Sequence, residues 1–326
     1  MISPNDVFQI NSELAFEQTA LKVFKYQYQN NGVYRSYCDL LNVSPSDVIH
    51  YNDIPFLPIQ FFKTHHVVSS KSENEVIFTS SGTTGVLTSK HYVTDLKIYE
   101  SSYLNGFETF YGNVEDYVVL ALLPSYLERE GSSLIYMVND LIKRSKNTDS
   151  GFYLNNTNAL RQKIIGLENK GQKTLLIGVS FALLDFIEQE SFELKHTIIM
   201  ETGGMKGRRK ELIREELHHT LKKGFGVDHI HSEYGMTELL SQAYSRGDGL
   251  FSCPPWMKIL IREPEDPLSI SNTTKSGGIN IIDLANYNSC AFIATQDLGK
   301  VHSNNSFEIL GRFDHSDIRG CNLMVL

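Results

Sequence analysis

Apolar residues near the N-terminus recur with the spacing of an amphipathic helix. Four of them stand at positions i, i+4, i+7 and i+8, which places them on one stripe. They are Phe16, Ala20, Val23 and Phe24. The polar run at residues 30–32 (NNG) is expected to end this helix. The apolar stretch at 54–62 (IPFLPIQFF) carries Pro55 and Pro58, so we expect extended chain pressed on a core rather than a helix.

Further along the chain, apolar runs typical of strands alternate with helical patterns. The expected strands are Glu75–Thr79, Tyr117–Leu123, Thr174–Gly178, Thr197–Glu201, Asp228–His231, Lys258–Arg262, Ile279–Asp283 and Ala291–Thr295. A helical pattern between two of them has Ile213, Leu217 and Leu221 at i, i+4 and i+8. This alternation predicts an α/β fold with mostly parallel sheets. From about Phe251 only short strands and turns are predicted, so we expect an α/β core over residues 1–250 and a small β-rich subdomain over residues 251–326.

Composition and charge narrow the classes of partner. Of the 326 residues, 41% are apolar, and 38 acidic residues against 30 basic ones give a formal net charge of −8. With no long basic cluster, this balance argues against a nucleic-acid partner. The longest apolar stretch, Thr174–Ile187, is too short and too polar to span a membrane. We therefore expect a cytoplasmic protein without a membrane span.

The metal-ligating residue types do not form a recognisable metal motif. The cysteines Cys38, Cys253, Cys290 and Cys321 have spacings that match neither a disulfide framework nor a zinc site. His229 and His231 share one face of a predicted strand, but no third ligand has suitable spacing. Reduced thiols and no zinc are the expectation.

A loop rich in hydroxyls and glycine follows the first predicted strand of the alternating region. It reads Thr79-Ser80-Ser81-Gly82-Thr83-Thr84-Gly85, and Lys90 comes five residues later. Glycines let the backbone approach a ligand closely, while hydroxyls and backbone N–H groups can face anionic oxygens, so the loop is suited to phosphate. The ordinary phosphate loop requires a lysine where the nearest candidate, residues 166–174, has Gln172. A surface turn is the structural alternative.

Four other short motifs stand near the ends of predicted strands or near the C-terminus. They are Glu201-Thr202-Gly203-Gly204, Tyr234-Gly235-Met236-Thr237-Glu238, Thr295-Gln296-Asp297-Leu298-Gly299 and Gly311-Arg312-Phe313-Asp314. Ligands of open parallel sheets bind beyond the carboxyl ends of the strands, so the hydroxyl-rich loop and the first two of these motifs, which carry glycines at strand ends, can converge on one ligand. Each motif alone is a weak signal.

The order of these motifs resembles the adenylate-forming superfamily of acyl-CoA ligases and luciferases. The N-terminal region looks more like one branch, the acyl-protein synthetase of the bacterial bioluminescence fatty-acid reductase. The resemblance implies that ATP and Mg²⁺ bind here, with Lys90 and Arg312 at the phosphates, Glu238 at Mg²⁺ and Asp297 at the ribose. It also implies nucleotide contacts from the hydroxyl-rich loop, from Gly203 and Gly204, and from residues 234–237. The implied fold is the family's N-terminal domain, with the β-rich subdomain completing the nucleotide site.

The end of the sequence distinguishes this branch from CoA ligases. The departures inside the motifs are modest and affect Gln296, Asp314 and His315. The larger departure is at the end, where only residues 312–326 remain and CoA ligases continue into a lid domain. We expect the lid and its lysine to be absent. In this branch a cysteine near the C-terminus accepts the acyl group, and here that position is Cys321.

The sequence therefore predicts an ATP-dependent acyl-protein synthetase that activates a fatty acid as acyl-AMP and transfers it to Cys321, for delivery to a partner reductase or carrier protein. Three alternatives stay open. One is a carboxylate-CoA or carrier-protein ligase whose lid comes from another chain. The second is a hydrolase using Ser180, because residues 178–182 (GVSFA) imitate a nucleophile elbow except at Ala182. The third is a catalytically silent nucleotide-binding partner module.

Overall fold

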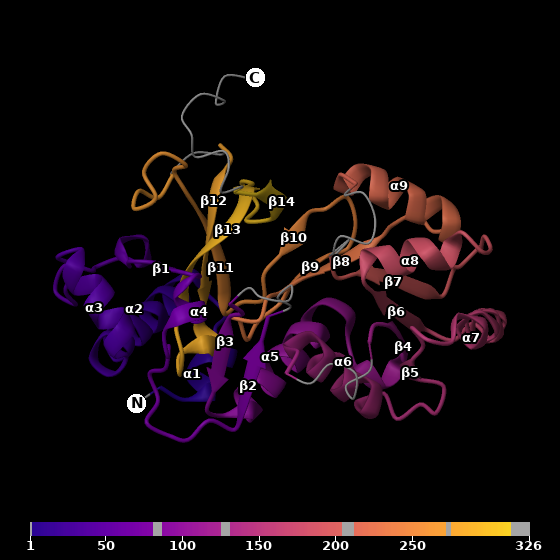
Figure 1. Ribbon diagram of the computed structural model, residues 1–326, viewed down its shortest axis with the longest axis horizontal. Coiled ribbons are helices and arrows are strands. Elements are labelled where there is room, and N and C mark those ends of the chain that lie inside the picture. The colour runs from indigo at the N-terminus through magenta and orange to yellow at the C-terminus, as the bar shows by residue number, and fades with distance from the viewer. Residues whose placement is uncertain (1, 81–86, 125–130, 204–211, 272–274, 314–326) are drawn as a thin grey trace. The chain divides into compact units, whose positions relative to one another are not determined.

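The structure is a computed structural model, and it describes residues 2–80, 87–124, 131–203, 212–271 and 275–313. By their contacts the residues form two units (Figure 1). One unit joins residues up to Lys71 with residues from Pro255 onward, and the other contains Ser72–Pro254. This grouping differs from the expected division near residue 250, because the N-terminal helices pack with the C-terminal β-rich region.

The first unit combines small N-terminal helices with an antiparallel sheet. Its helices are α1 (Pro4–Phe8), α2 (Glu13–Asn30), α3 (Gly32–Leu40) and α4 (Phe61–Thr64), with the 3-10 turns η1 (Tyr51–Asp53) and η3 (Leu284–Asn286). Its strands are β1 (Leu57–Pro58), β11 (Met257–Arg262), β12 (Gly277–Asp283), β13 (Phe292–Val301) and β14 (Phe307–Arg312). Strands β11 to β14 pair in chain order, all antiparallel, and β1 adds in parallel to β13.

The predicted amphipathic helix is confirmed as α2, and its apolar stripe is fully buried. Phe24 lies against Tyr34 of α3 and Phe292 of β13, with ring centroids 6.1 and 6.3 Å apart. Asn31 ends α2 and also caps α3, because its side-chain oxygen accepts from Tyr34 N at 3.0 Å. In the stretch at 54–62, Leu57–Pro58 form the extended strand β1. The prediction was wrong for the end of the stretch, because residues 59–60 form a turn and Phe61 begins α4.

The second unit is a largely parallel sheet with helices between its strands. Its strands are β4 (Val118–Leu122), β5 (Gly151–Phe152), β6 (Thr174–Gly178), β7 (Thr197–Glu201), β8 (His231–Tyr234), β9 (Ala243–Ser245) and β10 (Phe251–Ser252). Its helices are α5 (Leu96–Tyr111), α6 (Ser133–Arg144), α7 (Thr157–Asn169), α8 (Ser180–Ile187) and α9 (Arg214–Phe225), with the 3-10 turn η2 (Val114–Asp116). The order is β5-β4-β6-β7-β8-β9-β10, parallel up to β8 and antiparallel after it.

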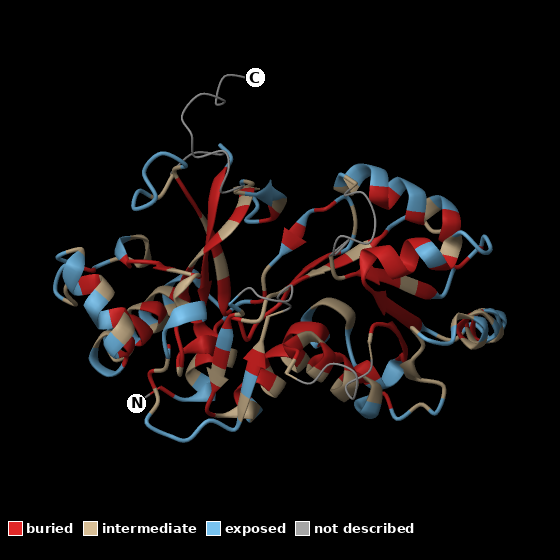
Figure 2. Ribbon diagram, viewed as in Figure 1, coloured by how far each residue is buried: buried red, intermediate tan, exposed pale blue. Residues whose placement is uncertain are grey.

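The predicted α/β class is confirmed, and burial explains why the central strands were recognisable. Every residue of β4 and β6 is buried, as Figure 2 shows, because helices cover parallel strands on both faces. Such strands are continuous apolar runs, which the sequence displays directly. Within this unit α8 and α9 pack together, and a Cβ on Gly224 would stand 2.5 Å from Cδ1 of Ile187.

Two local predictions were wrong. The strand expected at Asp228–His231 begins only at His231, because it pairs with β7 through Met200↔His231 and Glu201↔Ser232. The strand before the hydroxyl-rich loop was expected in a parallel sheet. It is β2 (Val76–Thr79), which instead forms a separate antiparallel hairpin with β3 (Lys90–Val93).

Candidate active site

The β2–β3 hairpin places Lys90 at the base of the hydroxyl-rich loop. Thr79 and Lys90 are direct partners in the antiparallel register. Ser80 N donates to Ser89 O at 3.1 Å, and Ser89 N donates to Ser80 Oγ at 2.9 Å, so the neck of the loop is closed. Lys90 is exposed. Ser81, Gly82, Thr83, Thr84 and Gly85 lie outside the described residues.

A buried histidine joins this hairpin to the motif that follows β8. His91 is completely buried, and its Nδ1 lies 2.8 Å from the carbonyl oxygen of Thr237. Tyr234 ends β8, and a turn closed by Leu239 N and Met236 O at 3.1 Å follows it. The structure therefore brings the segment containing Thr237 and Glu238 to the strand that begins with Lys90.

Close packing explains the glycine of this motif. A Cβ on Gly235 would stand 2.4 Å from Oε1 of Glu233 and 3.3 Å from Cγ of Gln242, so a larger residue would displace both side chains. Glu238 is 6% exposed. A carboxylate at such a position is the type of ligand that Mg²⁺ prefers.

The carboxyl end of β7 carries a buried carboxylate, Glu201, which the sequence analysis named within the motif at 201–204 but gave no role of its own. Glu201 is 2% exposed, and its Oε2 accepts from Gly203 N at 2.6 Å and from Ser180 Oγ at 3.3 Å. Gly203 has φ +72°, a conformation that glycine adopts readily. Gly204 lies outside the described residues. The available signal was a charged residue ending a strand that is otherwise apolar.

A second carboxyl group lies near Glu201 on the neighbouring strand. Burial, and then the charge of Glu201, raise the pKa of Glu233 to about 8. Burial opposes ionisation of Glu201 too, but His218, Arg214, Ser232 and Gly203 N–H stabilise its anion and lower its pKa. At neutral pH one carboxylate of this pair is therefore ionised and the other is mostly protonated.

The contacts of Ser180 do not form a hydrolytic triad. Ser180 begins α8 directly after β6, as a nucleophile elbow would, but it is 2% exposed. Its hydroxyl donates to Glu201, and His218 lies on the other oxygen of that carboxylate, with Nε2 3.6 Å from Oε1. A triad requires the histidine between the serine and the acid. The buried serine is a structural partner of Glu201.

Asp297 and Arg312 belong to the first unit, where they face each other across β13 and β14. They are register partners, and Arg312 Nε lies 3.1 Å from Asp297 Oδ1. Asp297 N donates to Thr295 Oγ1 at 3.1 Å, and the buried Arg262 donates to Thr295 O. The Asp297 side chain is 10% exposed and that of Arg312 is 71% exposed. Cys321, like Asp314 and His315, lies outside the described residues.

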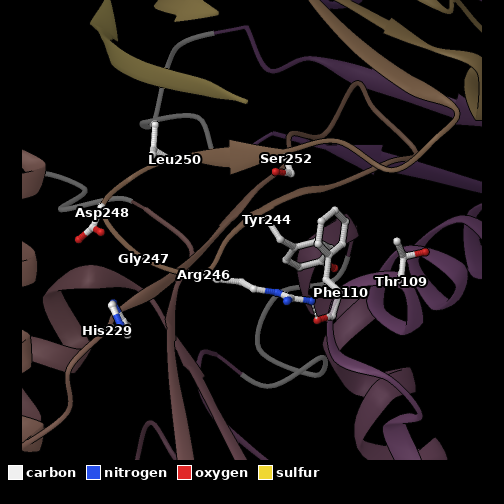
Figure 3. A pocket seen from close by; sticks show the side chains of 9 residues that line it. All are labelled: Thr109, Phe110, His229, Tyr244, Arg246, Gly247, Asp248, Leu250 and Ser252. Atoms are coloured by element: carbon white, nitrogen blue, oxygen red, sulfur yellow. Dashed lines mark hydrogen bonds between the residues drawn. The ribbon is translucent and has the colours of Figure 1, made fainter. Parts of the chain in front are cut away.

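A surface pocket of the second unit contains none of the predicted site residues. It measures about 500 Å³ and is lined by Thr109, Phe110, His229, Tyr244, Arg246, Gly247, Asp248, Leu250 and Ser252 (Figure 3). Arg246 donates to the carbonyl oxygen of Phe110 and lies over the rings of Phe110 and Tyr111. His229 precedes β8, whereas the predicted motif follows it, so the pocket lies at the other end of that strand.

Two features of the turn after β7 fit a bound nucleotide. Around the Cα of Gly203, an added Cβ would meet no described atom within 4 Å. In the described part of the chain, the buried hydroxyl oxygen of Thr202 has no hydrogen-bond partner.

Comparison with known families gives a match at the N-terminal end of the chain. Residues 4–98 match the family described as "Acyl-protein synthetase, LuxE". A "Long-chain-fatty-acid--luciferin-component ligase" of Vibrio harveyi is 24% identical over 92% of this chain and 84% of its own. The predicted family resemblance is confirmed. A protein of the same name from Photorhabdus luminescens is 35% identical over 71 residues, which are 22% of this chain and 60% of its own.

Comparison with solved structures shows that this chain has the fold of the adenylate-forming ligases. ATP-bound MatB from Rhodopseudomonas palustris is similar with a TM-score of 0.54 and 18% identity, over 75% of this chain and 49% of that one. The chain thus spans about half the length of MatB. 2-Hydroxyisobutyryl-CoA ligase, solved with R3-HIB-AMP, gives a TM-score of 0.67 at 11% identity, over 95% of this chain and 70% of that one. The solved structures thus show the fold of adenylate-forming ligases, and the family match shows similarity to acyl-protein synthetases.

None of the helices in the described ranges has the length and apolar character needed to cross a membrane.

Proposed function

We propose that the protein is an ATP-dependent acyl-protein synthetase acting on a fatty acid. The observation that carries this proposal is the match to the acyl-protein synthetases, which includes the β2–β3 hairpin with Lys90. The relative from Vibrio harveyi, similar over most of the chain, bears the name of a long-chain fatty acid ligase. The fold of an ATP-bound ligase agrees with nucleotide chemistry.

The first step is activation of the acid. A carboxylate oxygen of the fatty acid forms a bond to the α-phosphorus of ATP, the bond from that phosphorus to the bridging oxygen breaks, and pyrophosphate leaves with the electron pair. Negative charge accumulates on the phosphate oxygens, so Lys90 and Arg312 are assigned to stabilise it. Glu238 is assigned to Mg²⁺, which would neutralise phosphate charge when bound. Asp297 is assigned to the ribose hydroxyls.

The second step transfers the acyl group to the protein. The thiolate of Cys321 attacks the acyl carbon, the bond from that carbon to the phosphate oxygen breaks, and AMP leaves. Among the other cysteines, Cys38 and Cys290 are poor nucleophiles, because burial raises the pKa of each thiol to about 12. The thioester would then pass its acyl group to a reductase or a carrier protein.

Exchange of labelled pyrophosphate into ATP tests both steps. Wild type should exchange label only when a fatty acid is present. The Cys321→Ser variant should keep exchange but fail to retain a labelled acyl group after denaturation, because a hydroxyl offers almost no anion at neutral pH. Cys253→Ser is the matched control, since Cys253 is the partly exposed cysteine of the described residues. Labelling of Cys321→Ser at the wild-type level would refute the thioester step, and acyl-CoA formed on addition of CoA would favour a CoA ligase.

A further inference from the structure

Glu201 is a charged side chain enclosed at the end of a buried strand. It is the last residue of β7, and its neighbour Met200 is 1% exposed. Burying a carboxylate is costly unless polar groups surround it. The partners of Glu201 therefore indicate what its charge is used for.

Each carboxylate oxygen of Glu201 has its own set of partners. Oε2 accepts from Gly203 N at 2.6 Å and from Ser180 Oγ at 3.3 Å. Oε1 lies 3.6 Å from His218 Nε2 and 4.0 Å from Arg214 Nε. One oxygen thus fixes the turn that follows β7, while the other is held by two residues of α9.

Among the described residues, nothing closes the turn fixed by Glu201 on the side of Gly203. Its φ of +72° is held by the short hydrogen bond from Gly203 N, and no described atom would come within 4 Å of an added Cβ. Thr202 N donates to Gly178 O at 3.0 Å, so the chain before the glycine is anchored to β6. A rigid backbone beside open space is suited to the close approach of a ligand.

We propose that Glu201 is a positioning residue, which holds the Gly203 turn in the conformation that binds the nucleotide. This inference rests on the proposed function. The charge of Glu201 is compatible with a nearby anionic ligand, because the guanidinium of Arg214 partly compensates it. The neighbouring Glu233 adds little negative charge at neutral pH, because burial raises its pKa to about 8.

The test compares three variants by fatty-acid-dependent pyrophosphate exchange and by direct ATP binding in calorimetry. Glu201→Ala removes the acceptor of Gly203 N–H, whereas Glu201→Gln keeps an amide oxygen that can accept it. Glu168→Ala is the matched control, because Glu168 of α7 holds the other end of β7. Glu168 also accepts backbone N–H groups, including His196 N at 2.9 Å, and it binds the hydroxyl of Thr197 at 3.0 Å.

Glu201→Ala should raise the KM for ATP by about tenfold to hundredfold, since a misplacement of about 1 Å in a site can cost about a hundredfold. Glu201→Gln should stay within about threefold of wild type, because the hydrogen bond to Gly203 survives. The KM for the fatty acid should not change. Glu168→Ala should lower stability without altering the KM for ATP, because loss of folded protein lowers only the apparent kcat.

Two other results would overturn the inference. In the first, wild type exchanges pyrophosphate, but either Glu201→Ala has the wild-type KM for ATP or Glu168→Ala raises that KM as much as Glu201→Ala does. Glu201 then has no positioning role, while the proposed function stands. If wild type neither binds ATP nor exchanges pyrophosphate with any fatty acid, the proposed function fails and the inference fails with it.

Discussion

Gln27 is the polar residue on the buried stripe of α2, and replacing it should destabilise the first unit strongly. Its Nε2 lies 3.2, 2.9 and 3.2 Å from the carbonyl oxygens of Asn286, Tyr287 and Ser289, and its Oε1 accepts from Ala291 N at 3.1 Å. Gln27 is fully buried. One amide side chain therefore satisfies the backbone of the turn between β12 and β13.

The magnitude follows from the number of hydrogen bonds that one amide can make. Nε2 has two hydrogens, so Gln27 makes about three well-formed bonds in total, two donated and one accepted. A buried group left without its partner costs about 1–3 kcal/mol, and such costs are not additive. Gln27→Met keeps the length of the side chain and removes all of these bonds. We expect a loss of about 3–5 kcal/mol in the free energy of unfolding.

Urea denaturation followed by circular dichroism measures this loss, and hydrogen exchange of residues 286–291 locates it. Gln18→Met on the exposed side of the same helix is the control and should change stability by less than about 0.5 kcal/mol. A loss below about 1 kcal/mol for Gln27→Met, or unchanged protection of that turn, would refute the reasoning.

Three further predictions concern the candidate site. The raised pKa of Glu233, about 8 against an ordinary 4.5, means that the folded state holds the proton more tightly, so stability falls as pH rises from about 4.5 to 8. The pKa of His231 is lowered to about 4, and this raises stability with pH only below the ordinary histidine value of 6.5. Thermal melts of Glu233→Gln should therefore show a smaller loss of stability between pH 6.5 and 8 than those of wild type. Asp297→Asn should raise the Kd for ATP about tenfold to a hundredfold, since bonds to a charged group contribute about 1.5–3 kcal/mol; an unchanged Kd in calorimetry would leave Asp297 as a turn residue. Gly203→Ala should lower the free energy of unfolding by about 1–2 kcal/mol, because Gly203 has a φ of +72°, and it should weaken ATP binding. The control Gly32→Ala, at the start of α3, should change neither stability nor ATP binding.

The parts of the fold that were predictable are those with a strong local pattern. Strands β4, β6 and β7 are apolar runs because they are buried, and α2 shows its stripe at helical spacing. Strand β8 was misplaced because His231, Ser232 and Glu233 are polar, as residues at a strand end near a site can be. The pairing of β2 with β3 depends on contacts across a loop, which no local pattern reveals.

The candidate site shows the same division between local and long-range information. The motif around Glu238 was recognisable from five consecutive residues, and the structure links it to Lys90 through His91. His91 was not predicted, and Glu201 was named only as part of the motif at 201–204. Their roles depend on partners far along the chain, which are Thr237 for His91, and Arg214 and His218 for Glu201. Buried polar groups require such partners, so the roles of these two residues can be recognised only in the folded structure.

The mass of the intact protein tests the central claim most directly. Wild type, incubated with ATP, Mg²⁺ and a panel of fatty acids, should gain the mass of one fatty acid less one water molecule. Hydroxylamine should remove that gain, and Cys321→Ser should never show it. Pyrophosphate and AMP released without any gain in protein mass, together with acyl-CoA formed once CoA is added, would contradict an acyl-protein synthetase.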